Sequence, residues 1–97
     1  MKKLQRHNIY RQAIEKWGCE SQIDMLVEEC AELIVAVNHA RRGQWVGQVI
    51  HDLINELADV EIMLEQMRQL FDEDEIDRVK VGKVLRLKNR IEGADED

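Results

Sequence analysis

Two short segments of the sequence each carry a pair of carboxylates three residues apart. The first pair is Glu29 and Glu32, and the second is Glu56 and Asp59. On an α-helix this spacing places side chains about 60° apart around the axis and about 4.5 Å apart along it. Like charges so placed repel, and a hard divalent cation reverses that interaction. We therefore expect one acidic cluster on two packed helices, which binds magnesium through carboxylate oxygens.

Both pairs border the apolar side of the helices that carry them. At about 100° per residue, Glu29 lies about 60° and Glu32 about 120° from Leu26, the centre of one apolar stripe. On the other helix, Glu56 lies about 100° from Leu57. Partly buried carboxylates need partners. The alternative is solvated surface charge, because Glu is a good helix former, but two pairs that each lie within an apolar pattern favour the cluster.

A di-iron centre is the other metal site that helical bundles build. It requires Glu-x-x-His on the bundle helices. None of the three histidines, His7, His39 and His51, has a glutamate three positions before it. The remaining interpretation is a site for a hard divalent cation such as magnesium.

The composition predicts an all-α protein. The chain has 97 residues, of which 44% are hydrophobic and 35% charged, with no proline and five glycines. This mixture suits amphipathic helices better than disorder, and little in it interrupts a helix. We expect a single domain over 1–97, a four-helix bundle-type protomer whose central helix pair forms the core. The predicted segments are helices over about 3–17, 19 or 21 to 42, 48–71 and 75–91, a loop at 43–47 and a disordered tail at 93–97.

The third predicted helix is apolar on more than one side. One stripe runs through Leu53, Leu57, Val60 and Leu64, and further apolar residues such as Ile62 lie on other sides. A helix of this kind is buried on more than one face. Because the chain is short, we expect the extra cover to come from another subunit, in a homodimer or a dimer-of-dimers tetramer.

The charge and the N-terminal residues restrict the partners. A net charge of −6 does not suit a protein that coats a nucleic-acid backbone or an anionic membrane. No apolar run approaches the length of a membrane span. The basic start, residues 1–6, has no apolar core behind it, and two cysteines do not make a disulfide framework. We expect a reduced, cytoplasmic protein.

The two acidic motifs together resemble a known group. The pattern EExxE over residues 28–32, followed by ExxD over 56–59, resembles the all-α nucleoside triphosphate pyrophosphohydrolases. These are the MazG-like proteins, related to the dimeric dUTPases and dCTP pyrophosphatases. The resemblance covers about residues 17–91 and implies hydrolysis of a nucleoside or deoxynucleoside triphosphate to its monophosphate and pyrophosphate, with Mg²⁺ or Mn²⁺ as cofactor. It also implies that four residues bind the metal, namely Glu29, Glu32, Glu56 and Asp59.

Glu28 is a candidate general base for the attacking water, or a ligand of a second metal ion. Magnesium between the acidic cluster and the triphosphate neutralises developing charge and orients that water. The position of Glu28, about 200° from Leu26 around the helix, points away from the core. A solvated surface glutamate is therefore the alternative.

The fourth predicted helix and two earlier residues are candidates for substrate contacts. Residues 78–90 hold six of the 14 Lys and Arg residues of the chain, and by resemblance Lys83, Arg86 and Arg90 bind the phosphates. The alternative is a solvated face. By the same resemblance Gln22 contacts the base, and the indole of Trp17 could stack on it, although tryptophan also serves as a core anchor or an interface residue.

A second hypothesis is a non-enzymatic helical adaptor. In that case the glutamate pairs are ordinary solvent-exposed charges, and the apolar side chains beyond those needed for the core bind a partner. The adaptor predicts no magnesium requirement and no loss of function on Glu32→Gln.

Overall fold

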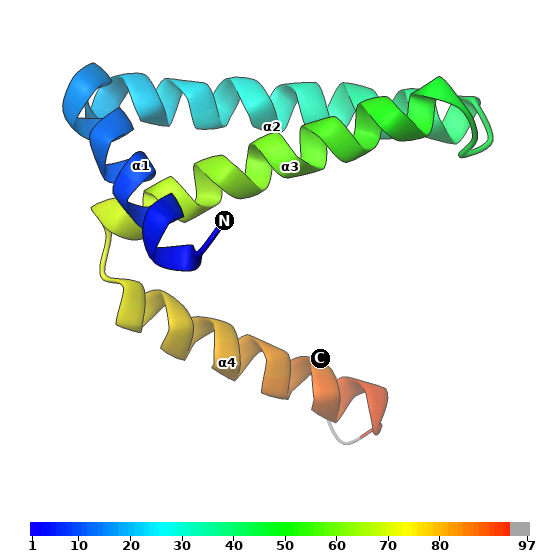
Figure 1. Cartoon of the computed structure of the whole chain (residues 1–97). Helices are drawn as coiled ribbons and strands as arrows, with labels where there is room; N and C mark the ends of the chain where they lie inside the picture. The colour runs from blue at the N-terminus through cyan, green and yellow to red at the C-terminus, as the bar shows by residue number, and fades with distance from the viewer. Residues whose placement is uncertain (94–97) are drawn as a thin grey trace.

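The computed structural model describes residues 1–93 (Figure 1). Its regular elements are four helices, namely α1 (Lys3–Trp17), α2 (Cys19–Arg42), α3 (Gln48–Leu70) and α4 (Glu73–Ile91). The predicted all-α class, the four helices and the loop at 43–47 are confirmed, although α4 begins two residues earlier than expected. None of the four helices combines the length and apolarity needed to cross a bilayer. Of the predicted tail at 93–97, residues 94–97 lie outside the described residues.

The helix ends follow from local chemistry. Gly18 separates α1 from α2 with φ 88°, a conformation that a side chain disfavours, and its N–H donates to the carbonyl of Ile14 at 2.8 Å. Asp72 caps α4, because its Oδ1 accepts a hydrogen bond from the Glu75 N–H at 3.1 Å. A glycine and a capping aspartate therefore set these two helix boundaries.

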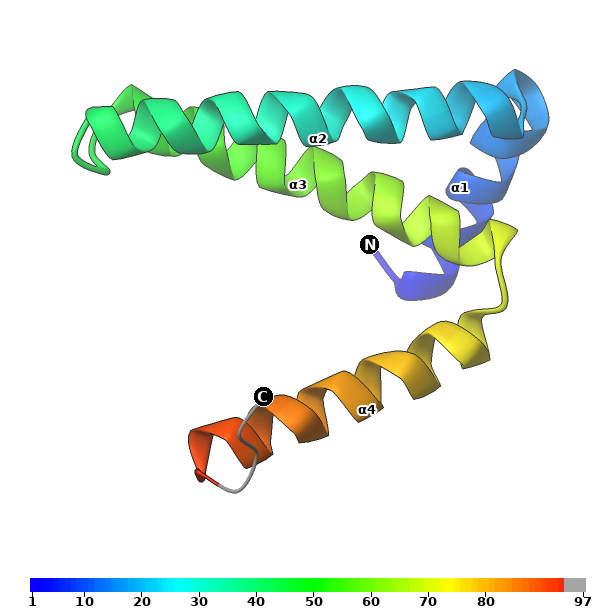
Figure 2. The same cartoon turned by 180° about the vertical axis from the view of Figure 1, so that it is seen from behind.

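The antiparallel pair α2–α3 is the centre of the molecule. The two helices lie side by side and are joined by the short loop at 43–47 (Figures 1 and 2). Small residues on α2 let α3 approach closely, and flexible methionines of α3 fill the interface. The buried residues of the pair are Gln22, Ala36, Ala40, Val60, Met63, Gln66 and Met67.

Helix α1 crosses the end of this pair that lies away from the loop (Figure 1). It contacts both α2 and α3, and it buries Tyr10. The side-chain amide of Gln69 donates to the carbonyl of His7 at 2.9 Å, and Arg6 forms an ion pair with Glu65 at 3.8 Å. These contacts fix α1 to the C-terminal part of α3.

Helix α4 leaves the α2–α3 pair at 71–72 and diverges from it (Figures 1 and 2). Among the described helices, it has close backbone contacts with α3 alone. Arg68 holds its start by donating to Glu73 at 3.1 Å and to Asp77 at 2.6 Å. After Ile76 every residue of α4 is exposed. The radius of gyration of 16.8 Å exceeds the roughly 13 Å of a compact domain of this size, so one copy does not close into a four-helix bundle.

Candidate metal centre

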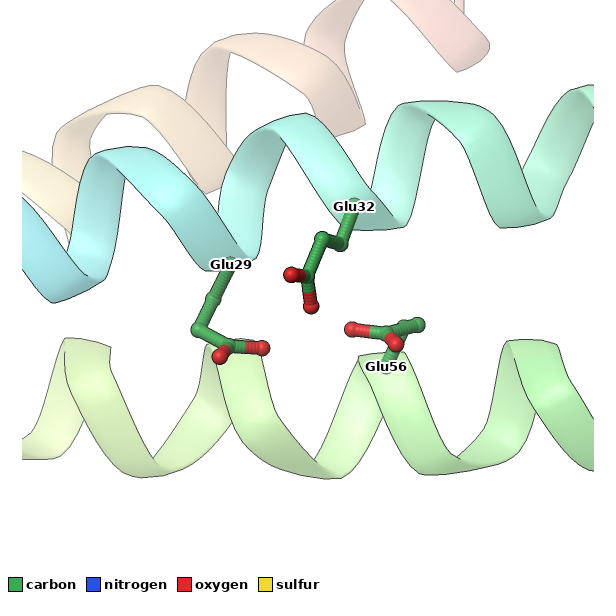
Figure 3. Close-up of side chains that lie close together, drawn as sticks. All are labelled: Glu29, Glu32 and Glu56. Carbon is green, nitrogen blue, oxygen red and sulfur yellow. The ribbon is translucent and has the colours of Figure 1, made fainter.

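Three carboxylates from the two central helices meet in the middle of the α2–α3 pair. Glu29 and Glu32 extend from α2 and Glu56 from α3, and their carboxylates point toward one another between the helices (Figure 3). One oxygen of each lies within 4.8 Å of the other two. Two oxygens that share one Mg²⁺ are at most about 4.2 Å apart. Small rotations of the side chains would therefore bring all three to the ion.

The positions of these residues around their helices explain the convergence. Glu29 lies seven residues after Gln22 and seven before Ala36, and both of these are buried. Seven residues return to within about 20° of the same direction on an α-helix, so Glu29 points into the interface with α3. By the same spacing Glu56 shares the direction of the buried Met63. Each central helix thus directs one glutamate into the contact.

Burial and mutual repulsion raise the pKa of both interface glutamates. Burial is the largest cause at Glu29, whose pKa reaches about 7 against an ordinary 4.5. The negative charges of its neighbours add to this shift, in the order Glu32, Asp59 and Glu56. Burial, followed by the charges of Glu32 and Asp59, also raises the pKa of Glu56. A proton or a cation must offset this concentration of negative charge.

Two oxygens of the cluster are shielded without a donor. The Oε2 atoms of Glu29 and Glu56 are inaccessible to solvent, and no hydrogen bond from the described residues reaches them. Buried acceptors are ordinarily paired, and a buried carboxylate oxygen needs a hydrogen-bond donor or a metal. The donor set of three carboxylates suits a hard cation such as Mg²⁺. The residues present therefore fit the metal that the sequence predicts.

The other predicted acidic residues lie at the edge of this group. Asp59 is exposed and does not belong to the three-carboxylate group, although it is near enough to raise the pKa of Glu29 and Glu56. Glu28 is also exposed and lies one turn before Glu32 on α2. The structure thus brings together three of the four predicted ligands. Asp59 is near enough to act on their charge, and Glu28 is exposed on α2 outside the group.

A groove of about 410 Å³ adjoins the cluster between α2 and α3. Glu32 and Glu56 form part of its wall, and His39, Asp52 and Asn55 extend it toward the 43–47 loop. These last three residues were not among the site residues predicted from the sequence. They lie on both sides of the loop in the sequence. To predict that they meet, one would need the register of the antiparallel α2–α3 pair, in which Glu32 lies opposite Glu56.

The predicted phosphate contacts do not reach the cluster within one chain. Lys83, Arg86 and Arg90 are exposed on α4, which makes no close backbone contact with α2 among the described residues. None of the three lines the groove beside the cluster.

The predicted base contacts are also separate from the carboxylates. Gln22 is buried in the helix interface, about two turns before Glu29. Trp17 is 59% exposed at the end of α1, with the Lys16 ammonium 5.4 Å from its ring centre. The roles of both residues stay predictions.

In comparisons with known proteins, no family model, curated protein or solved structure matches this chain. The resemblance to the pyrophosphohydrolases stays a prediction from the two acidic motifs. The meeting of Glu29, Glu32 and Glu56 is the structural observation that bears on it.

Proposed function

We propose that the protein is a magnesium-dependent hydrolase that converts a nucleoside or deoxynucleoside triphosphate to its monophosphate and pyrophosphate. The observation that carries this proposal is the convergence of Glu29, Glu32 and Glu56 from two helices. Two of their oxygens are shielded and receive no hydrogen bond within the described part of the chain. Surface glutamates that only solubilise a helix do not point into its packed interface. The groove beside the cluster offers a ligand direct access to Glu32 and Glu56.

The carboxylates have distinct proposed roles. Glu29, Glu32 and Glu56 hold the metal, and Asp59 at the edge completes the set directly or through a water. Held by these carboxylates, Mg²⁺ would supply positive charge against the charge that develops on the phosphates and would make a bound water more acidic. Glu28, exposed one turn before Glu32 on α2, is the proposed general base that accepts a proton from the attacking water. This arrangement supports attack on a phosphoanhydride bond.

Cations on the far side of the triphosphate complete the proposed site. Lys83, Arg86 and Arg90 keep the proposed phosphate role, which requires α4 to approach a cluster that it does not contact in one chain. Gln22 and Trp17 keep the proposed base contacts. We also propose that the protein works as a homodimer or a dimer of dimers, because the apolar sides of α3 and α4 are incompletely covered in a single copy.

Pyrophosphate release from a panel of ribo- and deoxynucleoside triphosphates tests the activity. We expect turnover with Mg²⁺ or Mn²⁺, loss of turnover with chelator, and loss in Glu32→Gln. The matched control is Glu20→Gln, an exposed glutamate in the first turn of the same helix, which should retain activity. If no nucleotide is hydrolysed with any divalent ion, the hydrolase is rejected and the adaptor hypothesis is favoured.

A further inference from the structure

Helix α4 presents a face on which apolar and basic side chains alternate. Ile76, Val79, Lys80, Lys83 and Leu87 follow helical spacing along one side, which we call the α4 face. These residues line an apolar groove of about 800 Å³. Val79 and Leu87 are 51% and 54% exposed. Nothing within the described part of the chain covers this face beyond Ile76.

Helix α3 presents a second incompletely covered face of opposite charge. This face carries residues at i, i+4 and i+7, which are Leu57, Glu61 and Leu64. We call these three residues and Glu65 the α3 face. Leu57 and Leu64 are 43% and 49% exposed. Near the start of α4 this face meets Ile76 and Lys80 around a groove of about 480 Å³. The two faces are therefore neighbours at the 71–72 connection.

One copy does not bring these two faces together along their length. Arg68 ties Glu73 and Asp77 to the end of α3, and from there α4 diverges (Figures 1 and 2). Only the first turns of α4 reach the α3 face of their own chain. Monomeric proteins rarely leave large contiguous apolar faces in water. The uncovered parts therefore require a partner.

We propose that the α4 face of one copy packs on the α3 face of a second copy in a two-fold symmetric dimer. A two-fold interface needs a surface that is complementary to itself, and each copy carries both halves. The lysines of the α4 face complement Glu61 of the α3 face, and apolar residues flank the charges on both. This proposal specifies the surface for the self-association proposed above, and it does not depend on the hydrolytic chemistry.

Mass measurement by sedimentation or light scattering tests this surface with a matched pair on α4. Leu87 lies on the α4 face, and Leu85 lies on the other side of the helix with almost the same exposure, 55% against 54%. We expect a wild-type dimer, a roughly hundredfold weaker dimer in Leu87→Asp, and an unchanged dimer in Leu85→Asp. Because both leucines are exposed in one copy, helical circular dichroism should be equal in the two variants. A monomeric wild type, or equal effects of the two substitutions, would overturn the proposal.

Charge reversal supplies an independent test. Lys83→Glu places a negative charge against the acidic residues of the partner's α3 face, and we expect it to weaken the dimer roughly tenfold. Arg78→Glu, on the opposite side of α4, should leave association unchanged. Equal effects of the two reversals would contradict the proposed pairing. These tests measure association and not hydrolysis, so the two proposals can fail separately. A dimer that hydrolyses no nucleotide would reject the hydrolase and support the interface. A monomer that hydrolyses nucleotide would support the hydrolase and reject the interface.

Discussion

Glu29 of α2 and Glu56 of α3 meet across the interface of the two longest helices. Each has one oxygen that is shielded from solvent and receives no hydrogen bond from residues 1–93. A helix interface ordinarily excludes such a pair, because two negative charges there repel and lose their hydration. Glu32 adds a third charge at the same point. On this physical argument we expect the cluster to lower the stability of the metal-free protein, and a bound divalent cation would offset that cost.

The pH dependence of stability should reveal the cluster. The pKa of Glu29 is raised from 4.5 to about 7, and that of Glu56 is raised as well. The folded state then binds protons more tightly than the unfolded state, so stability is fully present below the unfolded pKa and is lost as pH rises through the folded pKa. With chelator present, we expect the melting temperature to fall between about pH 4.5 and 7. In Glu29→Gln the fall in melting temperature over this pH range should be smaller. An unchanged dependence of melting temperature on pH would show that Glu29 does not titrate as described.

Asp59 offers a test of the fourth ligand. The ExxD motif predicts that it binds the metal, yet it is exposed and lies outside the group formed by the three glutamates. We expect Mg²⁺ with a non-hydrolysable nucleotide to raise the melting temperature, and Asp59→Asn to abolish that rise. Thermal melts of the variant with and without ligand measure this. A rise equal to that of the wild type would remove Asp59 from the ligand set.

Gln66 is a buried amide whose Oε1 has no hydrogen-bond partner among the described residues. Replacing it with methionine, which has a similar shape, removes an unpaired acceptor from the interface and should stabilise the fold by about 1 kcal/mol. Gln69→Met is the matched control, because it deletes the hydrogen bond to the His7 carbonyl and should destabilise by roughly 0.5–1.5 kcal/mol. Urea unfolding gives both values, and a loss of stability in Gln66→Met would indicate that its amide is paired.

Much of the helical framework could be predicted from sequence. Gly18 and the glycines that bound the 43–47 loop mark helix ends, and Asp72 caps α4. The convergence of Glu29, Glu32 and Glu56 also followed from i, i+3 spacing beside apolar residues. These features depend on local geometry, which a single sequence specifies well.

The side of α3 that faces α2 could not be predicted in the same way. The sequence stripe included Leu57 and Leu64, yet both are exposed, while Val60, Met63 and Met67 are buried. Because α3 is apolar on several sides, periodicity alone does not distinguish the side that packs on α2 from the side left for another partner.

Long-range geometry accounts for the remaining differences. The groove with His39 and Asp52 depends on the register of α2 against α3, which the sequence analysis did not specify. The divergence of α4 depends on the connection at 71–72 and on the ion pairs of Arg68 with Glu73 and Asp77. Neither feature has a periodic sequence signal.

We propose that Glu29, Glu32 and Glu56 bind a hard divalent cation. A titration of Mn²⁺ followed by electron paramagnetic resonance counts the free ion directly and requires no substrate. We predict stoichiometric binding that Mg²⁺ displaces, loss of this binding in the Glu29→Gln, Glu56→Gln double variant, and full retention in Glu20→Gln. Equal Mn²⁺ binding by the double variant and the wild type, with both folded, would contradict the account.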